Sequence, residues 1–207
     1  MPVAKVLQES ASQTAGPYLH IGMVPAAAGI TTRKQQPGNV LAGSGAKGER
    51  IRIEGYVYDG ADCLVRDAQI EIWQANAEGK YDHPEDRQNK PVDPDFQGFG
   101  RAVTDFESGL WYFETVKPGA VPGRHSRQMA PHVSAIIFAR GINMGLQTRI
   151  YFDDEPEANA NDPVLNLIEL PPRRETLLAK RGERGGQVVY RFDIYLQGDR
   201  ETVFFDV

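Results

Sequence analysis

Residues 187–197 read Gln-Val-Val-Tyr-Arg-Phe-Asp-Ile-Tyr-Leu-Gln, and this stretch decides the fold class. Every even-numbered position in it is apolar, whereas the odd positions include Arg191, Asp193 and Gln197. Side chains of a β-strand point alternately to opposite faces, so this period of two predicts a strand with one buried face. It is the clearest such signal in the chain and indicates a β-protein.

Shorter apolar runs recur along the chain and predict strands at residues 51–57, 68–75, 101–104, 110–115, 131–139, 148–152 and 203–205. We expect the strands at 101–104 and 110–115 to form a hairpin across Ser108-Gly109. Helical signals are limited to a turn over 162–168 and a helix from Pro172 to Gly182. This pattern predicts a mainly β fold, an antiparallel β-sandwich with short helical insertions.

Two parts of the chain are expected. Residues 1–50 have no sustained period and predict an extended N-terminal arm, whereas residues 51–207 form the sandwich domain. Within the arm, residues 14–21 combine Gly16, Pro17 and aromatic Tyr18, which fits either an ordered turn or a binding loop. The polar stretch 82–98, with three prolines, is either a functional loop or a disordered insert.

Composition excludes several classes of protein. A net charge of -5 gives no electrostatic support for binding nucleic acid or an anionic membrane, so neither partner is expected. There is no run of eighteen apolar residues, and polar residues interrupt positions 1–10, unlike a signal peptide. The single cysteine, Cys63, cannot form an internal disulfide, and a cytoplasmic location is expected.

Sequence motifs of serine hydrolases, P-loop proteins, zinc fingers and dinucleotide-binding proteins are absent. The histidines at 20, 83 and 125 are expected on surface loops, whereas His132 enters a buried strand. Ser134 lies two residues further on and therefore points to the same face as His132. A His-x-His pair would bind a metal from these positions, but a serine hydroxyl is a poor ligand, so only half of such a site is present.

Several blocks, in their order and spacing, resemble the intradiol ring-cleaving dioxygenases. Between residues 50 and 153 they are Ile-Glu-Gly-Tyr-Val-Tyr-Asp-Gly at 53–60, Ile-Glu-Ile-Trp-Gln-Ala-Asn at 70–76, Gly-Lys-Tyr at 79–81, Asp-Pro-Asp-Phe at 93–96, Val-Lys-Pro-Gly at 116–119 and Pro-His at 131–132. Blocks at 12–18 and 202–206 are similar to the α subunits of the two-chain members of this family.

The resemblance implies where the metal ligands of the family would fall. The family holds Fe(III) with two tyrosines and two histidines, a hard ligand set suited to a hard ion. Carried over by position, these ligands fall on Tyr81, Val121, His132 and Ser134, and a substrate-polarising arginine falls on Met129. The resemblance therefore implies that this chain binds no metal, that these are vestigial ligand positions, and that Tyr81 and His132 remain as packed, hydrogen-bonded residues.

The resemblance also implies a partner chain. Fe(III) would be bound by a homologous β chain, the substrates would be protocatechuate and O2, and no catalytic residue would lie in this chain alone. This chain would supply a substrate-binding wall made of Thr14, Gly16, Pro17, Tyr18 and Arg140. A threonine hydroxyl or a guanidinium can hold the carboxylate of such a substrate by charge-assisted hydrogen bonds.

Alternatives remain open. The chain is either this non-metal subunit, an autonomous intradiol dioxygenase with a modified metal site, or a non-catalytic β-sandwich scaffold or binding module. Arg140 either lines the substrate pocket or pairs with a surface carboxylate, and Tyr18 either lines the pocket or packs at an interface.

Overall fold

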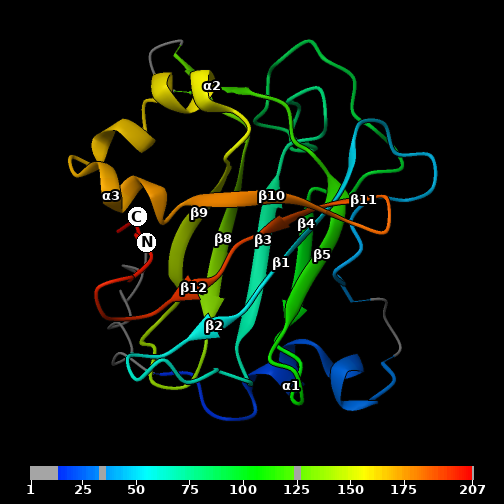
Figure 1. The fold of residues 1–207 in the computed structure, drawn as a ribbon. Helices are drawn as coiled ribbons and strands as arrows, with labels where there is room; N and C mark the ends of the chain where they lie inside the picture. Colours follow the sequence, from blue (N-terminus) through cyan, green and yellow to red (C-terminus); the bar gives the residue numbers. More distant parts are fainter. Residues whose placement is uncertain (1–13, 33–35, 124–126, 207) are drawn as a thin grey trace, which may run out of the picture.

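The computed structural model describes residues 14–32, 36–123 and 127–206. Strands dominate it, and Figure 1 shows two layers of strands with the helices at their margins. The strands are β1 Arg50–Gly55, β2 Val57–Tyr58, β3 Gln69–Gln74, β4 Phe99–Val103, β5 Trp111–Val116, β6 Val121–Pro122, β7 Gln128–Met129, β8 His132–Phe138, β9 Leu146–Phe152, β10 Leu178–Arg184, β11 Gln187–Arg191 and β12 Ile194–Tyr195. The helical segments are α1 Leu19–Met23, η1 Pro25–Ala28, α2 Pro156–Asn161, η3 Leu165–Leu167 and α3 Pro171–Glu175.

Eight strands follow one another in the order β4-β3-β8-β9-β10-β11-β1-β5. The predicted mainly β fold is confirmed, and most pairs are antiparallel as expected. Three pairs are parallel, namely β1 with β11, β9 with β10 and β2 with β12. The alternation in residues 187–197 does not reveal the direction of the neighbouring strand, so these parallel pairs were not predicted.

The core lies between the two layers. Apolar residues of β3, β8 and β9 pack against those of β1, β5 and β11, as the period of two predicts for strands with one buried face. Phe152 and Tyr190 show the contact directly, because their ring centroids are 4.8 Å apart across the layers. Trp111 is fully buried, with its ring edge toward Phe113.

β10 joins the layers. Leu178 and Ala179 pair in parallel with β9 of one layer, and residues 180–184 pair with β11 of the other. In Figure 1 this strand runs across the strands of both layers. The prediction of a helix from Pro172 to Gly182 is therefore wrong beyond Glu175, where α3 ends. Leu177 and Ala179 are buried, and their carbonyls accept hydrogen bonds from the amides of Tyr151 and Asp153 rather than from a helix of their own.

The predicted hairpin across Ser108-Gly109 is also wrong. β4 pairs with β3, whereas β5 pairs with β1, so the connection passes from one layer to the other. Residues 203–205 contribute only an isolated bridge from Phe205 to Gln147 rather than a strand. Sequence signals of strand and turn do not tell which layer each strand joins.

The N-terminal segment is less extended than expected. It contains α1 and η1, and Leu41 is buried in the core with its amide donating to Glu114 O at 2.8 Å. Residues 1–13 and 33–35 of the predicted arm lie outside the described residues. The described part of the arm thus packs against the sandwich by side-chain burial as well as by backbone hydrogen bonds.

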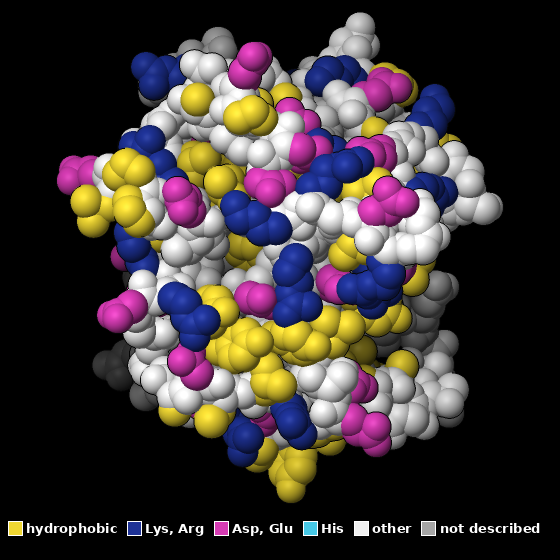
Figure 2. Space-filling view, in the orientation of Figure 1, with side chains coloured by type: hydrophobic (Ala, Val, Ile, Leu, Met, Phe, Trp, Pro, Cys, Tyr) yellow, Lys and Arg dark blue, Asp and Glu magenta, His cyan; other side chains and the backbone are white. Residues whose placement is uncertain are grey.

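One face of the molecule carries interspersed charges (Figure 2). Arg52 and Arg184 both contact buried Glu54, at 2.7 and 2.6 Å, and Arg52 also reaches Glu114. Below these charges, Figure 2 shows a hydrophobic band in the region of β2 and β12, where Tyr58 stacks on Tyr195. None of the helices in the described ranges has the length and apolar composition needed to cross a bilayer.

Candidate functional site

The residues predicted to bind substrate meet at one end of the sandwich. Thr14 forms a bridge with Asn143 and Ala15 forms one with Arg140, which lies just past the end of β8. The Thr14 hydroxyl donates to the carbonyl of Ile142 at 3.0 Å. The backbone then turns at Gly16, whose carbonyl accepts from Leu19 N at 3.2 Å, and enters α1. Segments more than 120 residues apart in sequence are thereby held side by side.

A cavity of about 400 Å³ lies beside this contact. Pro17, Tyr18 and Arg140 line it together with Asp67 and Phe106. Tyr18 is 76% exposed, so its ring does not serve the core of this chain. Thr14, Gly16, Pro17, Tyr18 and Arg140 are thus brought together at this end of the sandwich.

Arg140 pairs with a carboxylate, but with a buried one and not with the surface carboxylate of the alternative interpretation. Its Nε lies 2.5 Å from Oδ2 of Asp67. The Asp67 side chain is 8% exposed, whereas that of Arg140 is 63% exposed. The buried aspartate therefore fixes one edge of the guanidinium, and most of the cation stays accessible to a further anion.

His20 differs from its expected place on the surface. It lies in α1, is 2% exposed, and directs its ring edge toward Phe106 at a centroid distance of 4.9 Å. The short helix turns this side chain inward. The prediction that His20 lies on the surface is therefore wrong. It rested on a loop at this position, and the short helix that buries the side chain has no clear signal in the sequence. His83 is exposed as predicted, and His125 lies outside the described residues.

Tyr81, the first vestigial ligand position, is a packed aromatic residue. Its ring stacks on Trp73, with centroids 5.9 Å apart and planes 5° apart. Burial raises the pKa of the Tyr81 phenol, and the positive charge of Arg149 opposes part of that rise. The phenol is therefore protonated at neutral pH.

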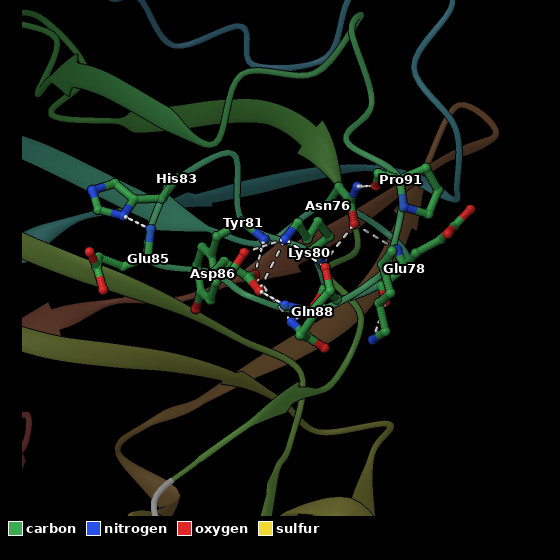
Figure 3. Close-up of polar contacts among 11 residues, drawn as sticks. Asn76, Glu78, Lys80, Tyr81, His83, Glu85, Asp86, Gln88 and Pro91 are labelled. Atoms are coloured by element: carbon green, nitrogen blue, oxygen red, sulfur yellow. Dashed lines mark hydrogen bonds and ion pairs between the residues drawn. The ribbon is translucent and has the colours of Figure 1, made fainter.

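The loop after Tyr81 is ordered by hydrogen bonds (Figure 3). Nζ of buried Lys80 donates to the carbonyls of Asp86 and Gln88 at 2.5 and 2.9 Å. The Asp86 carboxylate accepts from Tyr81 N at 2.8 Å and lies 3.2 Å from Lys80 Nζ. Burial would raise the pKa of Asp86, but hydrogen bonds from the amides of Gln88 and Tyr81, from the Gln88 side chain and from Lys80 lower it to about 2. The stretch 82–98 is thus a structured loop rather than a disordered insert.

His132 is buried at the start of β8. Its Nδ1 lies 2.8 Å from the carbonyl of Ala130, and the residue is 3% exposed. Burial, reinforced by the positive charge of Arg149, lowers the pKa of His132 to about 4. The imidazole is neutral at neutral pH, and its Nδ1 proton donates to Ala130 O.

The other two vestigial positions offer little to a metal. Val121 is buried in β6, and Ser134 faces Arg149 across the β8–β9 pair. Tyr81 and Val121 line one cavity, Ser134 lines its neighbour, and Trp73, Phe99 and Pro122 line both.

The donors at these positions do not fit Fe(III). A valine has no donor atom, a neutral serine adds no charge, and the fixed cation of Arg149 stands across from Ser134. Within the described ranges, no three side chains of His, Cys, Asp or Glu are grouped as metal ligands.

Two residues of this region were missed in the sequence. Asp162 is fully buried and its carboxylate accepts from the Tyr151 hydroxyl and from the amides of Ala130, Val164 and Leu165. Asp162-Pro163 was interpreted only as the start of a turn. Arg149 is the one charged residue of β9, whose sequence is Leu-Gln-Thr-Arg-Ile-Tyr-Phe, and this cation in a largely buried strand is the signal that the sequence offered.

Comparison with known proteins adds the family. A family model described as Dioxygenase matches residues 24–198. The protocatechuate 3,4-dioxygenase alpha chain of Pseudomonas putida is 53% identical over 206 residues, which span all of both chains. This chain belongs to the intradiol dioxygenase family. The resemblance stated from the sequence blocks is confirmed.

The chain is also similar to a beta chain and to a solved structure of the same family. The protocatechuate 3,4-dioxygenase beta chain of Burkholderia cepacia is 38% identical over 161 residues, covering 75% of this chain and 67% of that one. The dioxygenase domain of a Streptomyces sp. SirexAA-E fusion protein has a TM-score of 0.57 at 22% identity, covering 95% of this chain and all of that domain. That likeness supports the fold alone. Intradiol dioxygenases are non-haem iron enzymes, and alpha-type and beta-type chains both occur in the family.

Proposed function

We propose that this chain is the α subunit of a protocatechuate 3,4-dioxygenase and that a homologous β chain completes the enzyme. Full-length similarity to an alpha chain supports the assignment, and the existence of a distinct beta-chain relative supports the partner. The complete enzyme would open the ring of protocatechuate between its two hydroxyls with O2, giving 3-carboxy-cis,cis-muconate. The observation that carries the proposal is the meeting of Thr14, Tyr18 and Arg140 on one accessible surface.

This surface would form a wall of the substrate pocket. The accessible edge of Arg140 would hold the substrate carboxylate, and Asp67 would keep the guanidinium in place from behind. Thr14, Gly16, Pro17 and exposed Tyr18 would exclude water from one side of the aromatic ring. Asp67 was not among the residues predicted from sequence, because only the structure brings it to Arg140.

The metal would belong to the β chain. Fe(III) bound there would activate the catechol for reaction with O2, whereas the residues of this chain bind and orient the substrate. Support comes from the donor set at Tyr81, Val121, His132 and Ser134, because valine has no donor atom and a neutral serine is a poor ligand for that ion.

The iron assignment is tested with the purified chain alone. Tyrosinate bound to Fe(III) absorbs visible light, so we expect the isolated chain to be colourless and to contain negligible iron by metal analysis. The complex with the β chain should be coloured. A stoichiometric tyrosinate-to-iron band in the isolated chain would instead support an autonomous dioxygenase.

The substrate wall is tested by kinetics of the complex. We expect Arg140→Ala to lower kcat/KM for protocatechuate about tenfold or more, the size of one lost charge-assisted hydrogen bond. Tyr18→Ala should lower it less, and iron content should not change. Arg200→Ala is the matched control, because Arg200 is an exposed arginine paired with Asp62. Unchanged kcat/KM in both test variants would show that Arg140 and Tyr18 do not contact the substrate.

The scaffold alternative is tested by co-expression. We expect oxygen uptake on protocatechuate only when both chains are present. If an iron-loaded complex of the two chains takes up no oxygen, a non-catalytic scaffold is the better interpretation.

A further inference from the structure

His20 is a buried histidine whose ring has no hydrogen-bond partner among the described residues. The residue is 2% exposed, and neither Nδ1 nor Nε2 makes a hydrogen bond within residues 14–32, 36–123 and 127–206. It packs against the ring of Phe106, a side chain without polar atoms. Burial removes an imidazole from water, so leaving both nitrogens unpaired lowers the stability of the free chain.

The other buried histidine of the described residues is paired. His132 is 3% exposed, and its Nδ1 lies 2.8 Å from the carbonyl of Ala130. Burial in this fold therefore does not by itself deprive a histidine of partners. The unpaired ring of His20 is a feature of its own position.

That position is the cavity of about 400 Å³ beside Arg140. One residue separates Tyr18 from His20, yet Tyr18 is 76% exposed and His20 is 2% exposed. Both line the cavity, together with Pro17 and Arg140. His20 is thus part of the buried floor of the cavity, whereas Tyr18 is part of its exposed rim.

The charges around this cavity favour an anion. Its lining includes two arginines, Arg66 and Arg140, and one carboxylate, Asp67. Asp67 is bound to Arg140, and Arg66 donates through Nη1 to the backbone carbonyl of Phe106 at 3.4 Å. These side chains carry one net positive charge, which a single bound carboxylate would balance. A carboxylate accepts about four hydrogen bonds, so the accessible edge of Arg140 and one N–H of His20 can share it.

We propose that His20 donates a hydrogen bond to the carboxylate of the bound substrate, beside Arg140, and thereby determines the preference for catechols that carry this group. The assignment rests on the proposed function, because the cavity borders a substrate only in that enzyme. Either nitrogen of a neutral imidazole can carry the proton, so one donor is available in both tautomers. His20 would bind the substrate and take no part in breaking the ring.

The test compares protocatechuate with catechol, which lacks the carboxylate, on the iron-loaded complex of the full chain with the β chain. We expect His20→Phe to lower kcat/KM for protocatechuate about tenfold, mainly through KM, and to change that for catechol by less than about twofold. Dissociation constants measured without O2, from the change in the visible absorption of the iron site, should move by the same factors. Phe removes both unpaired nitrogens and keeps a ring against Phe106, so the variant chain should resist urea at least as well as the wild type.

Further variants separate hydrogen bonding from packing. His20→Gln restores an N–H donor and should recover part of the preference for protocatechuate. His83→Phe is the matched control, because His83 is exposed and does not line this cavity, and it should leave both substrates unaffected. If His20→Phe does not fold, His20→Leu, which also lacks both nitrogens, should show the same tenfold change.

Two results would overturn the role of His20. One is an equal loss for protocatechuate and catechol, which a packing role would produce, and the other is an unchanged value for protocatechuate in a folded variant. If Arg140→Ala lowers the preference for protocatechuate and His20→Phe does not, the proposed function stands and the role of His20 fails. If the wild-type iron-loaded complex takes up no oxygen on protocatechuate, both fail.

Discussion

At the scale of single residues, two side chains of metal-binding type, those of His132 and Tyr81, are held by contacts inside the chain. His132 donates to a backbone carbonyl, and Tyr81 stacks on Trp73. Burial favours the neutral form of each ring. The nearby charge of Arg149 adds to this effect at His132 and opposes it at Tyr81. The charge of Arg149 therefore acts on the protonation of both residues.

The buried imidazole of His132 predicts a pH dependence of stability. Its pKa is about 4 in the folded state, below the ordinary value of 6.5, so the unfolded chain binds the proton first. Stability contributed by neutral His132 is therefore fully present above pH 6.5 and declines toward pH 4 by up to about 3 kcal/mol. We expect His132→Asn to flatten this decline, measured by urea unfolding of the chain at pH 7 and pH 4.5. An identical decline in the variant would contradict the assignment.

Asp162 predicts a large loss of stability on truncation. Its buried carboxylate accepts four hydrogen bonds, and Asp162→Ala would leave those donors without a partner. We expect a loss of roughly 3 kcal/mol or more in the free energy of unfolding. Asp199→Ala, at an exposed carboxylate, should change it by less than about 0.5 kcal/mol. Similar losses in both variants would show that Asp162 has no special role.

At the scale of elements, alternation located most strands within a few residues. It failed where tertiary contacts decide the outcome. The sequence predicts a helix through residues 178–182, yet Leu178 and Ala179 pair with β9 and residues 180–184 pair with β11, so that the segment is β10. The strands at 101–104 and 110–115 have a good turn between them, yet they join different layers. Local sequence reports the period of an element, not its neighbour.

The residues of the candidate site also divide into those that the sequence indicates and those that only tertiary contacts reveal. Thr14, Tyr18 and Arg140 came from the resemblance, and their proximity was implied but not derivable from spacing. Asp67, Asp162 and Arg149 were missed because each acts through a partner distant in sequence. His20 was misplaced because a short helix reversed the direction of its side chain.

The loop after Tyr81 predicts a local effect of Lys80. Its ammonium holds two carbonyls and the Asp86 carboxylate, all inside the loop. We expect Lys80→Met to destabilise the chain by roughly 3 kcal/mol, since it leaves a buried carboxylate unpaired. Limited proteolysis should then cut within residues 82–91. Lys90→Met is the control, because Lys90 is exposed and, among the described residues, donates a single hydrogen bond, to Glu78 O. Equal protease resistance of the Lys80 variant and the wild type would argue against this role.

At the scale of the whole molecule, β8 separates the two regions of interest. His132 begins the strand and Arg140 lies just beyond its end. A strand of that length spans on the order of 25 Å. Changes at Arg140 and changes at Arg149 should therefore have additive effects on stability, measured by unfolding of the single and double variants. Coupling above about 0.5 kcal/mol would indicate that the regions communicate.

The strand β10 has a consequence for how the molecule comes apart. It is hydrogen-bonded to β9 in one layer and to β11 in the other, so neither layer can melt without freeing part of it. The two tryptophans offer a natural pair of reporters, with Trp73 on β3 in the first layer and Trp111 on β5 in the second. Trp73→Phe and Trp111→Phe would each leave one tryptophan. In each variant we expect the fluorescence of that tryptophan and the circular dichroism of the whole chain to give the same denaturant midpoint. Because β10 is hydrogen-bonded to both layers, we expect the two layers to unfold together in one cooperative transition.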